Sequence, residues 1–125
     1  MKNNSLYLLL VPLVALALTA CAPDPCNNTD YGVLSQIKNV GSGIKFIVSS
    51  DTSEEALIAV ASTSCSSRWC KLLIWGNAGD AGTRFPLTDR QVATQIAAYT
   101  HNLATGLEEL VIRGKSVPMG ACSNR

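Results

Sequence analysis

Several features that would assign a function directly are scarce in this sequence of 125 residues. It has one histidine and no apolar run of the roughly 20 residues that a helix needs to span a bilayer. Its charges nearly cancel, with ten Lys and Arg against nine Asp and Glu. Nucleic acids and anionic lipid surfaces are usually met by a basic excess. We therefore predict no nucleic-acid partner and no polybasic attachment to a membrane.

The first twenty residues have the pattern of an export signal. Lys2 supplies a positive charge, and the almost wholly apolar stretch 6–18 covers about 13 residues. That stretch is too short for a stable membrane helix, and Pro12 lies within it. We expect residues 1–20 to be a leader that takes no part in the fold.

The leader ends in Leu18-Thr19-Ala20-Cys21, an aliphatic residue and two small residues before a cysteine. This segment resembles the lipobox of bacterial lipoprotein precursors, in which the cysteine thiol is joined to diacylglycerol and the signal is cut just before it. The resemblance implies that Cys21 is lipidated, becomes the first mature residue and attaches the chain to a membrane. An ordinary secretory signal followed by a coincidental cysteine is the alternative.

A short Pro-rich tether follows Cys21, and we assign residues 21–30 to it. In Gram-negative lipoproteins an Asp directly after the lipidated cysteine favours retention in the inner membrane, whereas here that place holds Ala22. The resemblance therefore implies the outer membrane, on its periplasmic side, if the source has one. Residues 31–125 are expected to form a single small domain.

The other four cysteines form an even set, which suits structural disulfides in a small exported domain. Of three possible pairings we favour Cys65 with Cys70, which are close in sequence, and Cys26 with Cys122, which lie at opposite ends of the domain. A four-thiol metal site and a redox-active pair remain as alternatives, but the spacings lack the two-residue gaps that such sites use. No metal is predicted.

The apolar pattern predicts strands at 33–40, 44–48, 72–75 and about 109–113. Capping sequences predict two helices, one from Thr52-Ser53 to near Cys65 and one from Thr88 to near Gly106. In the second helix, apolar residues recur at helical spacing, at Val92, Ile96, Tyr99 and Leu103. The expected fold class is α+β: a disulfide-stapled, mixed four-stranded sheet in the order β-β-α-β-α-β, with two helices packed on one face.

One candidate binding segment is the polar, Gly-rich loop 76–84. If strands 44–48 and 72–75 are parallel, the loops after them reach one edge of the sheet, where ligands tend to bind. The loop lacks the Gly-Lys-Ser/Thr ending of a phosphate loop, and no cofactor is predicted. A solvated crossover is the alternative, with Asp80 and Arg84 paired to each other. Its candidate binding side chains are Asn77, Asp80, Thr83 and Arg84.

A second candidate is Arg68-Trp69, which lies between Cys65 and Cys70. An exposed Trp and Arg on a rigid loop are typical of binding hot spots, whereas the alternative is that Trp69 covers the edge of the core. His101 is expected at the end of the second helix as a partner of the helix dipole. The pair Glu108-Glu109 is expected in a solvated turn.

No residue is predicted to be catalytic. The sequence favours a membrane-anchored, non-enzymatic binding module for another envelope component, such as one with a role in secretion, conjugation, exclusion or immunity. The first alternative is a lipoprotein that binds a small molecule or anion at the sheet edge. The second is a small envelope hydrolase that uses His101 with the 76–84 loop.

Overall fold

The computed structural model describes residues 24–26, 34–39, 43–65 and 67–123. The leader and the lipidation site predicted at Cys21 lie outside these ranges. Within them, no helix has the length and apolar character required to cross a membrane.

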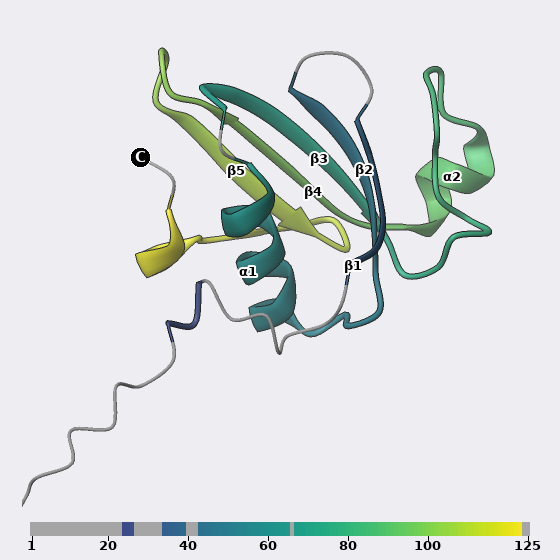
Figure 1. Ribbon diagram of the computed structural model, residues 1–125, viewed down its shortest axis with the longest axis horizontal. Coiled ribbons are helices and arrows are strands. Elements are labelled where there is room, and N and C mark those ends of the chain that lie inside the picture. The colour runs from purple at the N-terminus through teal and green to yellow at the C-terminus, as the bar shows by residue number, and fades with distance from the viewer. Residues whose placement is uncertain (1–23, 27–33, 40–42, 66, 124–125) are drawn as a thin grey trace, which may run out of the picture.

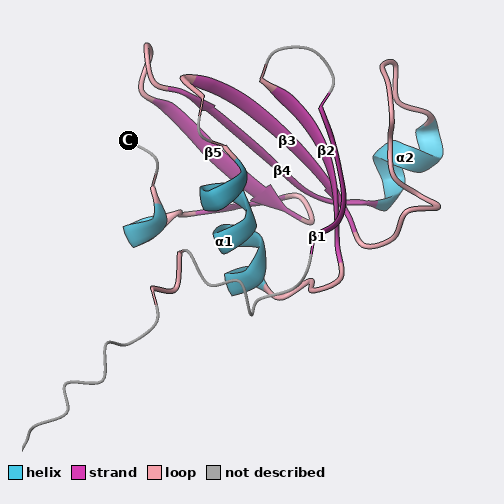
Figure 2. Ribbon diagram, viewed as in Figure 1, coloured by secondary structure: helices cyan, strands magenta, loops and turns pink. Residues whose placement is uncertain are grey.

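One mixed sheet of six strands, ordered as in the sequence, forms the body of the domain (Figure 1, Figure 2). β2 and β3 run parallel and all other neighbours are antiparallel. The α+β class is confirmed, but the sheet has six strands where four were predicted. The strands are β1 (Leu34–Asn39), β2 (Ile44–Ser49), β3 (Trp69–Trp75), β4 (Gln95–Asn102), β5 (Leu107–Ile112) and β6 (Lys115–Val117).

The crossover between β2 and β3 is helix α1 (Glu54–Ser64), which lies across one face of the sheet (Figure 1). Ser53 caps it, because its hydroxyl accepts a hydrogen bond from the Ala56 N–H at 3.1 Å. The buried side of the helix packs on the inner positions of β2 to β5. The resulting core includes Leu57, Val60, Ala61, Ile47, Leu72, Ile74, Tyr99 and Leu110.

A smaller core on the opposite face is covered by a loop instead of a helix. Phe46, Leu73 and Trp75 are buried there under the chain that follows β3. Gly82 of this loop comes so close that a Cβ atom added to it would lie 3.0 Å from both the Phe46 and Trp75 rings. Continuous apolar runs in β2 and β3 are therefore explained, since both faces of these strands are buried.

The long second helix was a wrong prediction. Helix α2 (Asp89–Thr94) begins at Thr88 with the expected capping box, but it ends after six residues and has no buried side chain. From Gln95 the chain becomes β4, in which burial alternates and places Ala97, Tyr99 and His101 on the α1 face. A longer helix would have no core to bury, whereas a strand here gains hydrogen bonds from both β3 and β5.

The two helices consequently do not share one face of the sheet. Figure 2 shows α2 beyond the end of β3, away from α1. The prediction also missed β6, which follows a two-residue turn at Arg113 and Gly114, both with positive φ (47° and 78°). Such a turn matches the twist of the strands that it joins.

Two disulfides, Cys26–Cys122 and Cys65–Cys70, close the structure, with Cα–Cα distances of 5.1 Å and 5.7 Å. This is the pairing favoured from the sequence. The first joins the beginning of the domain to the short 3-10 helix η2 (Gly120–Cys122), and the second joins the end of α1 to β3.

Candidate functional site

The two candidate binding segments lie at opposite ends of β3. Arg68 precedes the strand and Trp69 begins it, whereas the 76–84 loop follows Trp75 at its other end. A strand of seven residues spans about 20 Å. The two segments therefore cannot form one site.

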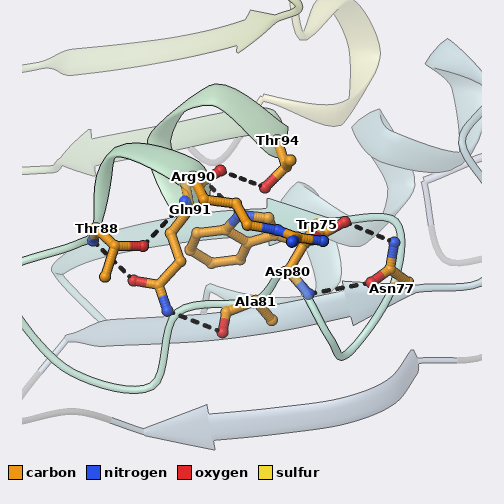
Figure 3. Close-up of polar contacts among 8 residues, drawn as sticks. All are labelled: Trp75, Asn77, Asp80, Ala81, Thr88, Arg90, Gln91 and Thr94. Carbon is orange, nitrogen blue, oxygen red and sulfur yellow. Dashed lines mark hydrogen bonds and ion pairs between the residues drawn. The ribbon is translucent and has the colours of Figure 1, made fainter.

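In the loop after β3, two of the four predicted ligand-binding residues, Asn77 and Asp80, bind each other. The Asp80 carboxylate accepts hydrogen bonds from Asn77 Nδ2 and Arg90 Nε, both at 2.9 Å, and Asn77 Oδ1 accepts from the Asp80 N–H at 3.0 Å (Figure 3). The bond from Asn77, followed by that from Arg90, holds the pKa of Asp80 below its usual 3.8. The ion pair of Asp80 is thus with Arg90 and not with Arg84.

The same loop is attached to the core through its backbone. Trp75 Nε1 donates to the Gln91 carbonyl at 2.8 Å, and Gln91 Nε2 donates to the Ala81 carbonyl at 3.4 Å (Figure 3). Thr83 and Arg84 remain exposed. The loop is therefore a cover for the second core, and of its four candidate residues Asn77, Thr83 and Arg84 are exposed, whereas Asp80 is partly buried.

At the start of β3, large apolar side chains are exposed together. Trp69, Leu103 and Leu107 are 39%, 45% and 49% exposed. Trp69 pairs with Asn102 on β4, and Asn102 pairs with Leu107 on β5. Trp69, Asn102 and Leu107 therefore lie in one row across the sheet, and Leu103 follows Asn102 in the chain. We call this region, the loop 67–70 with the turn 103–107, the disulfide-pinned end.

The backbone of the disulfide-pinned end is held from several sides. The Cys65–Cys70 bond closes the loop, and the Leu103 N–H donates to the Arg68 carbonyl at 2.8 Å. The Trp69 ring lies against Gly43, where a Cβ atom would come within 2.4 Å of the ring. Exposed side chains on a fixed backbone lose little entropy when they bind.

A hollow of about 320 Å³ lies beside Leu103 and Leu107. Its size is at the lower limit of ligand pockets, roughly 300 Å³. The lining residues are His101, Asn102, Leu103, Gly106, Leu107 and Glu108.

A polar network lies beneath the disulfide-pinned end. His101 is 2% exposed, and its Nε2 and Nδ1 atoms lie 2.6 Å from the Ser67 carbonyl and 3.1 Å from the Tyr99 hydroxyl. Tyr99 donates to Glu108 Oε2 at 2.8 Å, and the Ser123 hydroxyl donates to Glu108 Oε1. The predictions of His101 at a helix end and Glu108 in a solvated turn are both wrong.

The structure does not bring His101 and the 76–84 loop together, as the hydrolase hypothesis would require. His101 is six residues from Gln95 along β4, which places it about 20 Å from the end of the sheet that carries the 76–84 loop. A general base must lie within hydrogen-bond reach of the proton that it takes. In addition, both ring nitrogens already face oxygen atoms.

Comparison with known proteins gives no match for this chain among protein-family models, curated proteins or solved structures. Fold relationships therefore supply no function, and the site residues have to carry it.

The sequence indicated Trp69 but missed its neighbours. Leu103 was assigned to the predicted second helix and no role was predicted for Leu107, although both lie at the hairpin that joins β4 and β5. Asn102 gives the signal that was available: its side chain accepts from the Ala104 N–H at 3.0 Å, as Asn does in turns, and Gly106 follows with φ 73°. In the parts of the chain that the structure describes, no group of three metal-ligating side chains occurs.

Proposed function

We propose that this protein is a membrane-anchored envelope lipoprotein that acts as a non-enzymatic binding module, and that its disulfide-pinned end contacts another envelope protein. The observation that carries the proposal is the joint exposure of Trp69, Leu103 and Leu107 on a fixed backbone. The resemblance of the segment ending in Cys21 to a lipobox supports the anchor. Attachment to the periplasmic side of an outer membrane belongs to the same proposal.

The composition of this end is that of a protein-binding centre. Trp and Arg are the residue types most enriched at binding hot spots, and both stand here as neighbours, Arg68 and Trp69. Asn102 supplies a polar group between the two apolar side chains of its row. An apolar centre with polar groups around it is the usual arrangement of interfaces that form between folded partners.

The test compares Trp69→Ala with Phe85→Ala in the full lipidated protein. Phe85 is a matched control, because it is 47% exposed and lies in the loop at the opposite end of β3. A photocrosslinker placed at Leu107 is used to capture partners in intact envelopes, and the captured protein is then titrated. We expect Trp69→Ala to weaken binding by roughly 30-fold or more and Phe85→Ala to leave it unchanged. Equal affinity of the two variants for the captured protein would overturn the proposed site.

A further inference from the structure

The sheet has an open side at the disulfide-pinned end, opposite the face that α1 covers (Figure 1). Cys70 and Leu110 belong to the core beneath α1, and side chains alternate along a strand. Lys71 and Glu109, their neighbours in β3 and β5, therefore face the side opposite α1. The loop after β3 covers that side around Trp75, at the far end of the strand. The part nearer the start of β3 is not under this loop.

This open side presents two rows of side chains that cross β3, β4 and β5. The outer row is Trp69, Asn102 and Leu107, and the inner row is Lys71, Thr100 and Glu109. All six residues are partly or fully exposed. In each row the larger side chains are on β3 and β5, and a smaller polar one is on β4. Apolar groups thus stand at both ends of the outer row, and opposite charges at both ends of the inner row.

The two charges of the inner row are not paired with each other. Lys71 and Glu109 are separated by two strand spacings, about 10 Å. Neither has an ion-pair partner among the residues that the structure describes. A complementary partner would therefore carry a negative charge opposite Lys71, a positive charge opposite Glu109, and apolar groups opposite Trp69 and Leu107. The chain itself has this arrangement when it is turned by 180° about β4.

We propose that the protein bound at the disulfide-pinned end is a second copy of this chain, related to the first by a two-fold axis along β4. The rotation exchanges β3 and β5. It brings Trp69 of each copy onto Leu107 of the other, and Lys71 of each copy onto Glu109 of the other. The same patch thus serves both copies, as in most symmetric dimers. The inference rests on the proposed function for the binding role of this end and names the partner.

The charges and the anchor both favour an axis along the strands. A two-fold axis across the strands would set Lys71 against Lys71 and Glu109 against Glu109 where the inner rows meet, and like charges opposed in an interface weaken it. Such an axis would also turn one copy upside down relative to the other. Rotation about β4 instead leaves every atom at the same height along the axis. Both Cys26 residues and the tethers before them then suit anchoring in one membrane.

The contact is small, because the loop after β3 occupies the same side farther along the strand. The two sheets therefore meet at the disulfide-pinned end and diverge toward their α2 ends. Interfaces of limited area are usually weak between freely diffusing proteins. Attachment of both copies to one membrane raises their effective concentration, which favours a dimer without any further contact.

The test uses the full-length lipidated protein in phosphatidylcholine vesicles, with the photocrosslinker at Leu107. We expect a crosslinked dimer in which the second copy is attached through residues 67–71. Lys71→Glu and Glu109→Lys each oppose like charges at two symmetric positions, and each should raise the protein-to-lipid ratio needed for half-maximal dimer roughly tenfold or more. The chain that carries both substitutions should return to within about threefold of the wild type, because the two effects are coupled.

Lys115→Glu is the matched control. Lys115 is an exposed lysine on β6 that pairs with Ile112 of the α1 core, so it faces the covered side, and its reversal should leave the dimer unchanged. A double variant as weak as either single variant would contradict the inference.

Capture of a different protein alone from Leu107 would also contradict it, but would leave the proposed function standing. The reverse case is separate, because the comparison of Trp69→Ala with Phe85→Ala tests the site for whichever protein is captured. The charge exchange tests the second copy alone.

Discussion

The two ends of β3 expose similar amounts of apolar surface but are held in different ways. Trp69 at one end is 39% exposed and Phe85 at the other is 47% exposed. The first stands on a loop closed by a disulfide and tied to a buried polar network, whereas the second belongs to a loop held by a surface ion pair and a helix cap. Exposure alone therefore does not distinguish a binding surface. The fixed backbone beneath it does.

The largest effects should come from the disulfides. Replacing Cys26 and Cys122 by Ser releases a bond between residues 96 positions apart and should cost on the order of 4 to 5 kcal/mol of unfolding free energy. Replacing Cys65 and Cys70 by Ser releases a bond between residues only 5 positions apart. By the same entropy argument it should cost roughly 2 kcal/mol of unfolding free energy. Urea midpoints measure both. A larger loss for the short bridge would show that it also holds the network in place.

Two glycines that touch aromatic rings give the next comparison. Gly43→Ala would place a Cβ 2.4 Å from the Trp69 ring and 2.6 Å from the Trp69 carbonyl, at a φ of 78°, so neither backbone nor ring can relieve it easily. We expect a loss of about 2 to 4 kcal/mol and a changed Trp69 fluorescence. Gly82→Ala meets a terminal methyl group of Leu87 first, at 2.6 Å, at a φ that is not positive, and should cost about 1 kcal/mol. Equal costs in thermal unfolding would mean that the two ends are equally fixed.

The smallest expected effect is a loss of stability in acid, in the loop after β3 that is paired to α2 through Asp80 and Arg90. The lowered pKa of Asp80 means that its carboxylate favours the folded loop above its usual value of 3.8, and that this contribution is lost as the pH falls through the lower folded value. Amide exchange in the segment 77–90 should therefore accelerate in acid before that of 67–70. Asp80→Asn should remove this pH dependence while leaving the exchange of 67–70 unchanged. Simultaneous acceleration of both segments would contradict the separation of the ends.

Local signals in the sequence identified much of the fold. The run 72–75 and the β-rich run 44–48 became neighbouring parallel strands, and the cysteine positions indicated the pairs that the structure forms. The Thr88 capping box also begins a helix as expected. These features depend on a few adjacent residues and on well-defined chemistry, which is why a sequence displays them.

The errors arose where a local pattern suited two structures. Ile96, Tyr99 and Leu103 fit helical spacing, but Ala97, Tyr99 and His101 fit a strand equally well. Pairing with β3 and β5 decides between them, and pairing between distant strands is not visible in a local pattern. The polar network at the candidate site was missed for the same reason, because His101, Glu108 and Ser67 come together only when β4 has paired with β3 and β5.

The Cys26–Cys122 bond also determines how the domain would bear a mechanical load. A pull on the chain ahead of Cys26 passes through the sulfur atoms into η2 instead of reaching β1 first. β1 is an edge strand that pairs with β2 alone, so a pull that reached it directly would open its hydrogen bonds one after another. In the proposed membrane-anchored state, with a partner bound at the other end, a load would therefore not peel β1 from the sheet first.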